Sequence, residues 1–181
     1  MRALTILLSV VIVALFSVAG VIAWDYFKIG RTIPASVAPA ARANLVLVEK
    51  QARRLTLLRD GRVLKIYDIA LGGDPVGHKQ EEGDSRTPEG AYAIDFKNPR
   101  SRFHLSLRVS YPNAADRSSA QQRSVPPGGD IMIHGRPNGL GLFGGLVLTR
   151  DWTDGCIAVT NGQIEEIWSM VDLNTAIEIK P

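Results

Sequence analysis

Short β-prone runs separated by glycine, proline and asparagine are the feature that most constrains the fold of this 181-residue chain. Asp60-Gly61, between two of these runs, is a typical hairpin turn. Residues 103–109 alternate apolar and polar side chains, as a half-buried strand does. The pattern predicts a mostly β domain with strands at Leu45–Val48, Leu55–Leu58, Val63–Tyr67, Ala91–Phe96, Phe103–Val109, Ile131–Ile133, Leu146–Leu148, Ile157–Val159 and Ala176–Ile179.

One main helix is predicted after Thr160. Apolar residues at 164, 167, 168 and 171 have the spacing of a single helix face, and Thr160 with Gln163 fits a capping box. The Gly-rich stretches around 72–90 and 125–145 are too long to be simple connections. We therefore expect these two loops to form a site.

The first segment is expected to meet a membrane. Residues 3–24 carry no charge, and a helix of that length spans about 33 Å, enough for a bilayer core of about 30 Å. We expect an anchor or signal segment over 1–24, an Ala/Pro-rich linker over 25–43 and one folded domain over 44–181. A retained transmembrane helix is favoured over a cleaved signal peptide, whose apolar region is shorter. A buried helix of a cytosolic protein is disfavoured, because the remaining chain is too small to enclose it.

Composition excludes several classes of function. With 1 cysteine and 3 histidines the chain forms no internal disulfide and no thiolate-rich metal site, so we expect neither metal nor cofactor. The net charge of +3, without a basic run among aromatics, gives no sign of a nucleic-acid partner. Residues 139–144 match G-x-G-x-x-G, but a strand-like run follows where a nucleotide site needs a helix. The oligomeric state stays open.

The informative constellation is His134 at the end of one strand and Cys156 at the start of another. Either residue alone is usually structural. Outside the cytosol, however, an only cysteine is a candidate reactive group, and a thiol needs a neighbouring imidazole to stabilise its thiolate near pH 7. Gly155 would let a substrate approach backbone N–H groups that hold an oxyanion. The constellation predicts acyl transfer.

These motifs carry a family resemblance. His134-Gly135, followed after a gap by Thr153-Asp154-Gly155-Cys156, resembles the His-Gly…(Ser/Thr)-His-Gly-Cys signature of YkuD-type L,D-transpeptidases. Residues 83–90, which contain Thr-Pro-Glu-Gly, resemble the Thr-Pro-x-Gly stretch upstream of that signature. The resemblance covers roughly residues 44–180. It implies a mostly β catalytic domain, a sandwich or barrel, that acts on peptidoglycan stem peptides in the bacterial envelope. Together with the first segment, this predicts a periplasmic catalytic domain that is anchored to the inner membrane or exported after signal cleavage.

The sequence departs from the family pattern at two positions. Asp154 stands where most members have a second histidine, and Ala158 stands where many have an arginine. Because a guanidinium is the usual partner of a carboxylate, Arg136 or Arg150 is expected to take that role. The segments 111–113 and 151–154 make the chain more similar to the YafK-type branch.

Cys156 and His134 are the predicted catalytic residues. Asp154 either caps its own turn or steers His134 or an incoming amine. His78 and His104 are expected to be structural or solvated. The remaining predictions, for oxyanion or substrate binding, are Gly155, Asp154, Gly135, Arg136, Trp152, Thr153 and Tyr111.

Three functions follow from the resemblance and the residues. The first is an L,D-transpeptidase that works through a thioester acyl-enzyme. The second is a hydrolase of the same fold, which would be an L,D-carboxypeptidase or endopeptidase or would cleave protein–peptidoglycan links. The third is a non-catalytic scaffold that binds the cell wall. Transfer and hydrolysis differ in whether the cleft excludes water and positions an amine, which the sequence leaves open.

Overall fold

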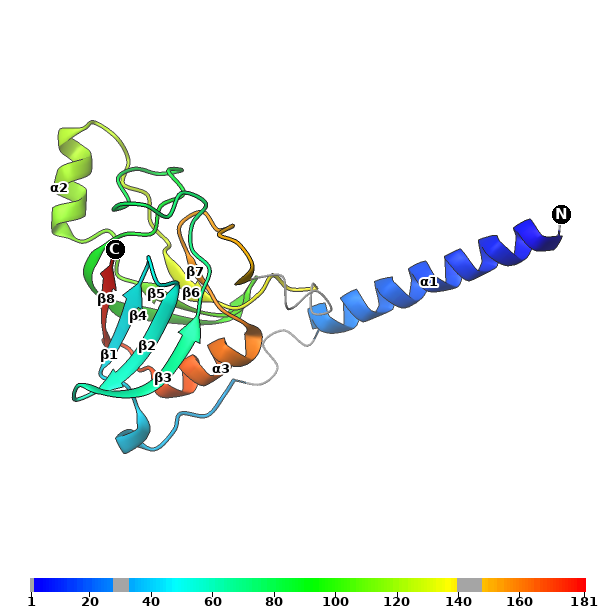
Figure 1. Cartoon of the computed structure of the whole chain (residues 1–181), viewed down its shortest axis with the longest axis horizontal. Coiled ribbons are helices and arrows are strands. Elements are labelled where there is room, and N and C mark those ends of the chain that lie inside the picture. Colours follow the sequence, from blue (N-terminus) through cyan, green and yellow to red (C-terminus); the bar gives the residue numbers. More distant parts are fainter. Residues whose placement is uncertain (1, 28–32, 140–147) are drawn as a thin grey trace.

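The computed structural model describes residues 2–27, 33–139 and 148–181 (Figure 1). Strands in these ranges form one mixed sheet in the order β3-β2-β1-β8-β4-β5-β6-β7. The predicted mostly β fold is therefore confirmed. The strands are β1 (Leu45–Glu49), β2 (Arg54–Arg59), β3 (Arg62–Asp68), β4 (Gly90–Ser101), β5 (His104–Val109), β6 (Met132–His134), β7 (Ile157–Ala158) and β8 (Ala176–Lys180).

The long strand β4 links the two halves of the sheet. Its first four residues pair antiparallel with β8, and its later residues pair antiparallel with β5. Two register shifts, at Ile94/Phe96 and Asn98/Ser101, interrupt the second ladder. Irregularities of this kind bend a strand and increase its twist, so the sheet curves along β4 (Figure 1).

The two ends of the strand order meet and close the sheet. Ala70, which follows β3, forms an isolated antiparallel bridge with Ala158 of β7. The backbone N–H of each donates to the carbonyl of the other, at 3.0 and 2.8 Å. Gly72 forms a second bridge with Thr153. Closure of this kind brings the loop after β3 onto the segment that carries Cys156.

The predicted helix after Thr160 is present as α3 (Asn161–Met170), and both halves of its capping box form. Its apolar face packs against β5 and β6. Lys97 lies over the Trp168 ring at 4.5 Å and donates to the Trp168 and Val171 carbonyls at the end of the helix. The α3 residues Ile164, Ile167, Trp168 and Met170 are all buried in the core.

The N-terminal segment forms helix α1 (Arg2–Phe27). In the described ranges, however, no helix is both long enough and apolar enough to cross a membrane. The predicted transmembrane anchor over residues 1–24 is thus not supported by the structure.

Part of the predicted linker packs against the domain. A short 3₁₀ turn, Pro39–Ala41, lies within it. The backbone N–H groups of Val37 and Ala43 donate to the carbonyls of Ser169 and Met170, at 3.0 and 2.9 Å. The ordered contacts of the domain therefore begin before residue 44.

One predicted strand is not found among the described residues, and one helix of the structure was not predicted. Strands are present at every predicted run except Leu146–Leu148. Most of that run lies outside the described residues, and Leu148 is in a 3₁₀ turn. Helix α2 (Ala114–Gln122) was not predicted, because it has no apolar stripe: its buried residues are Asp116 and Ala120. Figure 1 shows α2 and α3 at opposite ends of the sheet.

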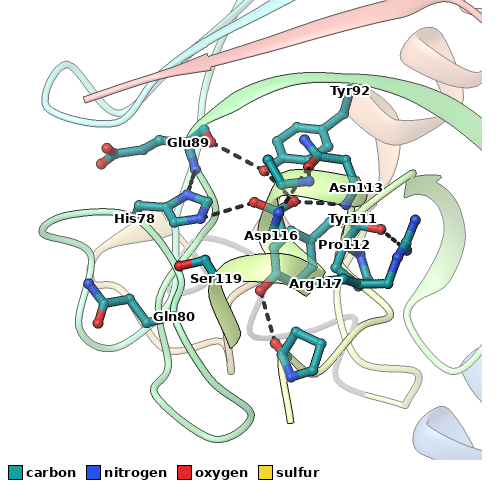
Figure 2. Close-up of polar contacts among 12 residues, drawn as sticks. His78, Gln80, Glu89, Tyr92, Tyr111, Pro112, Asn113, Asp116, Arg117 and Ser119 are labelled. Atoms are coloured by element: carbon teal, nitrogen blue, oxygen red, sulfur yellow. Dashed lines mark hydrogen bonds and ion pairs between the residues drawn. The ribbon is translucent and has the colours of Figure 1, made fainter. Parts of the chain in front are cut away.

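The carboxylate of Asp116 attaches α2 to the domain (Figure 2). One oxygen accepts the backbone N–H of Asn113 at 2.8 Å and the hydroxyl of Tyr92 at 3.1 Å. The other lies 3.1 Å from Nε2 of His78. Nδ1 of His78 accepts the backbone N–H of Glu89, so Nε2 carries the proton and donates to Asp116. His78 therefore has a structural role, in line with the sequence analysis.

Asp116→Asn is expected to lower the free energy of unfolding by about 1–3 kcal/mol, because one buried acceptor becomes an amide that faces donors. Asp95→Asn is the matched control, since Asp95 forms an exposed pair with Arg108 that is worth about 1 kcal/mol or less. Urea unfolding of both variants measures the difference. Equal shifts of the two midpoints would show that Asp116 does not hold α2.

Candidate active site

Strands β6 and β7 bring the two predicted catalytic residues to one cleft. They pair in parallel, with Ile133 opposite Ile157 and His134 opposite Ala158. Cys156 precedes Ala158 by two residues, so strand alternation places it on the same face as His134. Both side chains line a cavity of about 380 Å³. Its other described lining residues are Asn98, Arg100, Ser101, Arg102, Phe103, Ser106, Gly129, Asp130, Ile131, Met132 and Asp154.

The Cys156 thiol is partly buried beside the backbone of β6. Sγ accepts the Met132 N–H at 3.4 Å and lies 3.6 Å from the Asp130 carbonyl, to which the thiol donates. Burial raises the pKa of this thiol. The Met132 N–H opposes the shift, whereas the negative charges of Asp154 and Asp130 add to it. Cys156 is consequently a neutral thiol at neutral pH.

His134 is 3% exposed and held by one backbone bond. Its Nδ1 lies 2.7 Å from the Gly135 carbonyl, which can only accept, so Nδ1 carries the proton and Nε2 is left as an acceptor. The ring packs against Phe103 at 4.5 Å and against Trp152 at 5.8 Å between centroids. Burial lowers the pKa of His134 to about 4, although the Gly135 carbonyl favours the protonated form.

The resting pair differs from the sequence prediction of a thiolate stabilised by an imidazole. Burial penalises both charged forms, so the site holds a thiol and a neutral imidazole. No hydrogen bond joins Sγ of Cys156 to the His134 ring within the described residues. Such a pair suits general-base chemistry, in which the proton leaves the sulfur as the sulfur attacks.

The turn before Cys156 is fixed by a threonine hydroxyl and a glycine. The Thr153 hydroxyl donates to the Cys156 carbonyl at 2.7 Å and accepts the Gly155 N–H at 3.2 Å. Gly155 has a φ of 117°, and a Cβ there would lie 2.5 Å from the Arg86 carbonyl oxygen. Only glycine fits this position. The loop over residues 72–90 thus packs directly on the turn, as its length suggested.

Gly135 and Trp152, which were also predicted as site residues, lie next to His134. A Cβ on Gly135 would lie 2.7 Å from Oδ1 of Asn161, so the chain after His134 runs close to the start of α3. The same Oδ1 accepts the backbone N–H of Arg136 at 2.9 Å. Trp152 contacts His134 and Phe103 through its ring.

Some predicted residues lie elsewhere. Asp154 is exposed and lines the cleft, but Arg136 and the exposed Arg150 are not among its described lining residues. Tyr111 is buried near α2, where its hydroxyl donates to the Pro127 carbonyl at 2.9 Å (Figure 2). Burial raises its pKa to about 12. His104 pairs with Glu165 at 2.7 Å, a structural contact.

The hairpin between β4 and β5 supplies Arg100, Arg102 and Phe103 to the cleft, and these residues were not predicted from the sequence to belong to the site. Two arginines within three residues of a turn were the available signal, but nothing in the sequence places that turn beside Cys156. Within the described ranges, no group of three or more His, Cys, Asp or Glu side chains is arranged to hold a metal ion.

Comparisons with known proteins agree with this geometry. The family described as YkuD, the L,D-transpeptidase catalytic domain, matches residues 43–179. The Escherichia coli K12 protein named "Putative L,D-transpeptidase YafK" is 30% identical over 112 residues, which cover 61% of this chain and 38% of that protein. The chain therefore spans less than half the length of this relative.

Solved structures show the same fold. The helical cell shape determining protein Pgp2 of Campylobacter jejuni is 28% identical, with a TM-score of 0.57, over 76% of this chain and 48% of that one. An L,D-transpeptidase of Mycobacterium smegmatis is 16% identical, with a TM-score of 0.53, over 76% of this chain and 58% of that one. Because the family match covers residues 43–179, which include nearly all of the sheet and both His134 and Cys156, the protein belongs to the YkuD family of L,D-transpeptidase catalytic domains.

Proposed function

We propose that this protein is a cysteine-dependent L,D-transpeptidase that acts on peptidoglycan stem peptides through a thioester acyl-enzyme. The observation that carries the proposal is the placement of His134 at the end of β6 and of Cys156 immediately before the neighbouring parallel strand β7, with both side chains lining one cleft. Membership of the family supports the reaction class and the substrate class. The substrate places the activity in the bacterial cell envelope, with the catalytic domain in the periplasm.

His134 and Cys156 divide the first step between them. Nε2 of His134 takes the thiol proton while Sγ attacks the amide carbonyl on the L-centre of the third stem residue. The tetrahedral intermediate collapses as His134 returns the proton to the leaving amine, which departs as D-Ala. The sulfur is then joined to the donor as a thioester.

The developing oxyanion needs a donor at the turn. The Gly155 N–H is already bound by the Thr153 hydroxyl. The Cys156 N–H makes no hydrogen bond within the described part of the chain, which leaves it to receive the oxyanion. Thr153 and Gly155 thus hold the turn, and Cys156 supplies both the nucleophile and the first oxyanion donor.

The second step decides between transfer and hydrolysis. An acceptor amine attacks the thioester carbonyl, Nε2 of His134 takes a proton from the amine, and the thiol is regenerated. Water in place of the amine gives hydrolysis by the same route. We assign transfer as the principal reaction, and the product of the first test below decides it.

Incubation of the protein with a defined tetrapeptide muropeptide, with and without an amine acceptor, is expected to give the joined product only when the amine is present. Cys156→Ala should abolish the product, and His134→Ala should lower the rate by about 10²-fold or more. His78→Gln is the control, because His78 lies at α2 and away from the cleft. Mass spectrometry of the products and of the acyl-enzyme provides the measurement.

Other products would point to the other functions. A shortened donor without an amine would identify a hydrolase, and the absence of any acyl-enzyme in the folded protein would identify a scaffold. Slow reaction with iodoacetamide would distinguish nothing, because burial raises the pKa of Cys156 in an enzyme and a scaffold alike. The donor peptide is therefore the necessary probe.

The pH dependence tests the neutral resting pair. His134, with a pKa of about 4, stays neutral above that pH, and Cys156 stays protonated through neutral pH. We expect kcat/KM to fall on the acid side near pH 4 rather than near 6.5. NMR titration of the His134 ring should show the same midpoint, unchanged in Cys156→Ser. A ring that titrates above 6.5, and below that value in Cys156→Ser, would instead establish a thiolate–imidazolium pair.

A further inference from the structure

The hairpin between β4 and β5 presents two unpaired cations to the cleft. Arg100 and Arg102 are both exposed and both line the cavity that holds Cys156. Neither guanidinium has a hydrogen-bond or ion-pair partner among the described residues. Arg53 and Arg108, in contrast, each pair with a carboxylate. The two hairpin guanidinium groups are therefore available to a ligand.

The hairpin is held in a defined position. The Asn138 N–H donates to the Arg102 carbonyl at 3.0 Å, and its side-chain amide donates to the Ser101 carbonyl at 2.9 Å. Oδ1 of Asn138 accepts the His104 N–H at 2.9 Å. The Ser101 hydroxyl also accepts the Phe103 N–H. Because Asn138 follows His134 by four residues, the same segment positions the imidazole and the arginines.

Charge in the cleft is separated by sign. Asp130 and Asp154 line the cavity and act on Sγ, where both raise the pKa of Cys156. Arg100 and Arg102 belong to the hairpin instead. An anionic group that enters the cleft is repelled from the aspartates and attracted to the hairpin. Guanidinium groups bind carboxylates through paired, directional hydrogen bonds. The side of the cleft formed by Arg100 and Arg102, called the wall below, is therefore best suited to bind a carboxylate.

We propose that Arg100 and Arg102 bind a free carboxylate of the donor peptide and thereby orient it for attack by Cys156. This inference rests on the proposed function, because stem peptides are the donors that carry such carboxylates. This assignment replaces the sequence prediction that Arg136 or Arg150 binds the carboxylate, because neither is among the described lining residues of the cleft. The two arginines determine donor specificity and take no part in the proton transfers.

The first test measures the charge of the wall without any turnover. Cys156 is labelled with an anionic methanethiosulfonate, which carries a sulfonate, and with a neutral methyl methanethiosulfonate. Both reagents react with the thiolate, so the thiolate fraction of Cys156 cancels in the ratio of the two rates. We expect Arg100→Gln and Arg102→Gln each to lower this ratio by about two- to five-fold at low salt, with a smaller effect at high salt.

Arg62→Gln is the matched control, because Arg62 is an exposed arginine on β3 that does not line the cleft. It should leave the labelling ratio unchanged. Asp154→Asn should raise the ratio, since it removes a negative charge beside Sγ. Arginine variants with the same ratio as Arg62→Gln would overturn the proposal of an anion-binding wall.

The second test uses donor peptides that differ only in which carboxylate is amidated. Arg102→Gln should lower kcat/KM by about 10-fold or more for the free-acid donor. The variant should cause little further loss with the donor in which the recognised carboxylate is amidated. A loss of equal size with every donor would contradict carboxylate recognition. If no donor is turned over, the proposed function fails, while the labelling ratio still tests the wall.

Discussion

The parallel pairing of β6 with β7 is the interaction on which the rest of the site depends. It fixes His134 opposite Ala158 and so places Cys156 on the same face, toward the same cleft. The pairing is itself held by the bridge between Ala70 and Ala158, which joins the two ends of the strand order. Because a shift of one residue would turn Cys156 to the opposite face, the closure of the sheet and the juxtaposition of Cys156 with His134 depend on the same pairing.

The burial that stabilises this arrangement also sets its chemistry. His134 lies between Phe103 and Trp152, and the thiol lies against the backbone of β6. Low polarity favours the uncharged forms of both groups, so the resting site holds a thiol and a neutral imidazole. The Cys156 N–H makes no hydrogen bond within the described part of the chain, which is why we propose it as the oxyanion donor. A resting thiol also resists oxidation better than a thiolate does.

Sequence periodicity predicted the parts of the fold that bury apolar side chains. The alternation over 103–109 gave β5, and the spacing from Ile164 to Val171 gave α3. Helix α2 escaped prediction because its anchor is Asp116, a polar residue whose partners lie far away in sequence. The charge states of Cys156 and His134 depend on burial, which no local pattern encodes. The hairpin arginines became candidates only once the curvature of β4 had brought them to the cleft.

The burial of Ala158 gives a physical reason for the proposed carboxylate site to lie on the hairpin between β4 and β5 rather than on β7. Its side chain is fully buried, and its backbone forms both hydrogen bonds with Ala70. An arginine at this position would need room for a guanidinium where two segments close the sheet, and an isolated charge buried there would be costly. The hairpin has the opposite properties, because its arginines are exposed and its backbone is fixed by Asn138. A cation held there can reach the cleft without disturbing the closure that aligns His134 with Cys156.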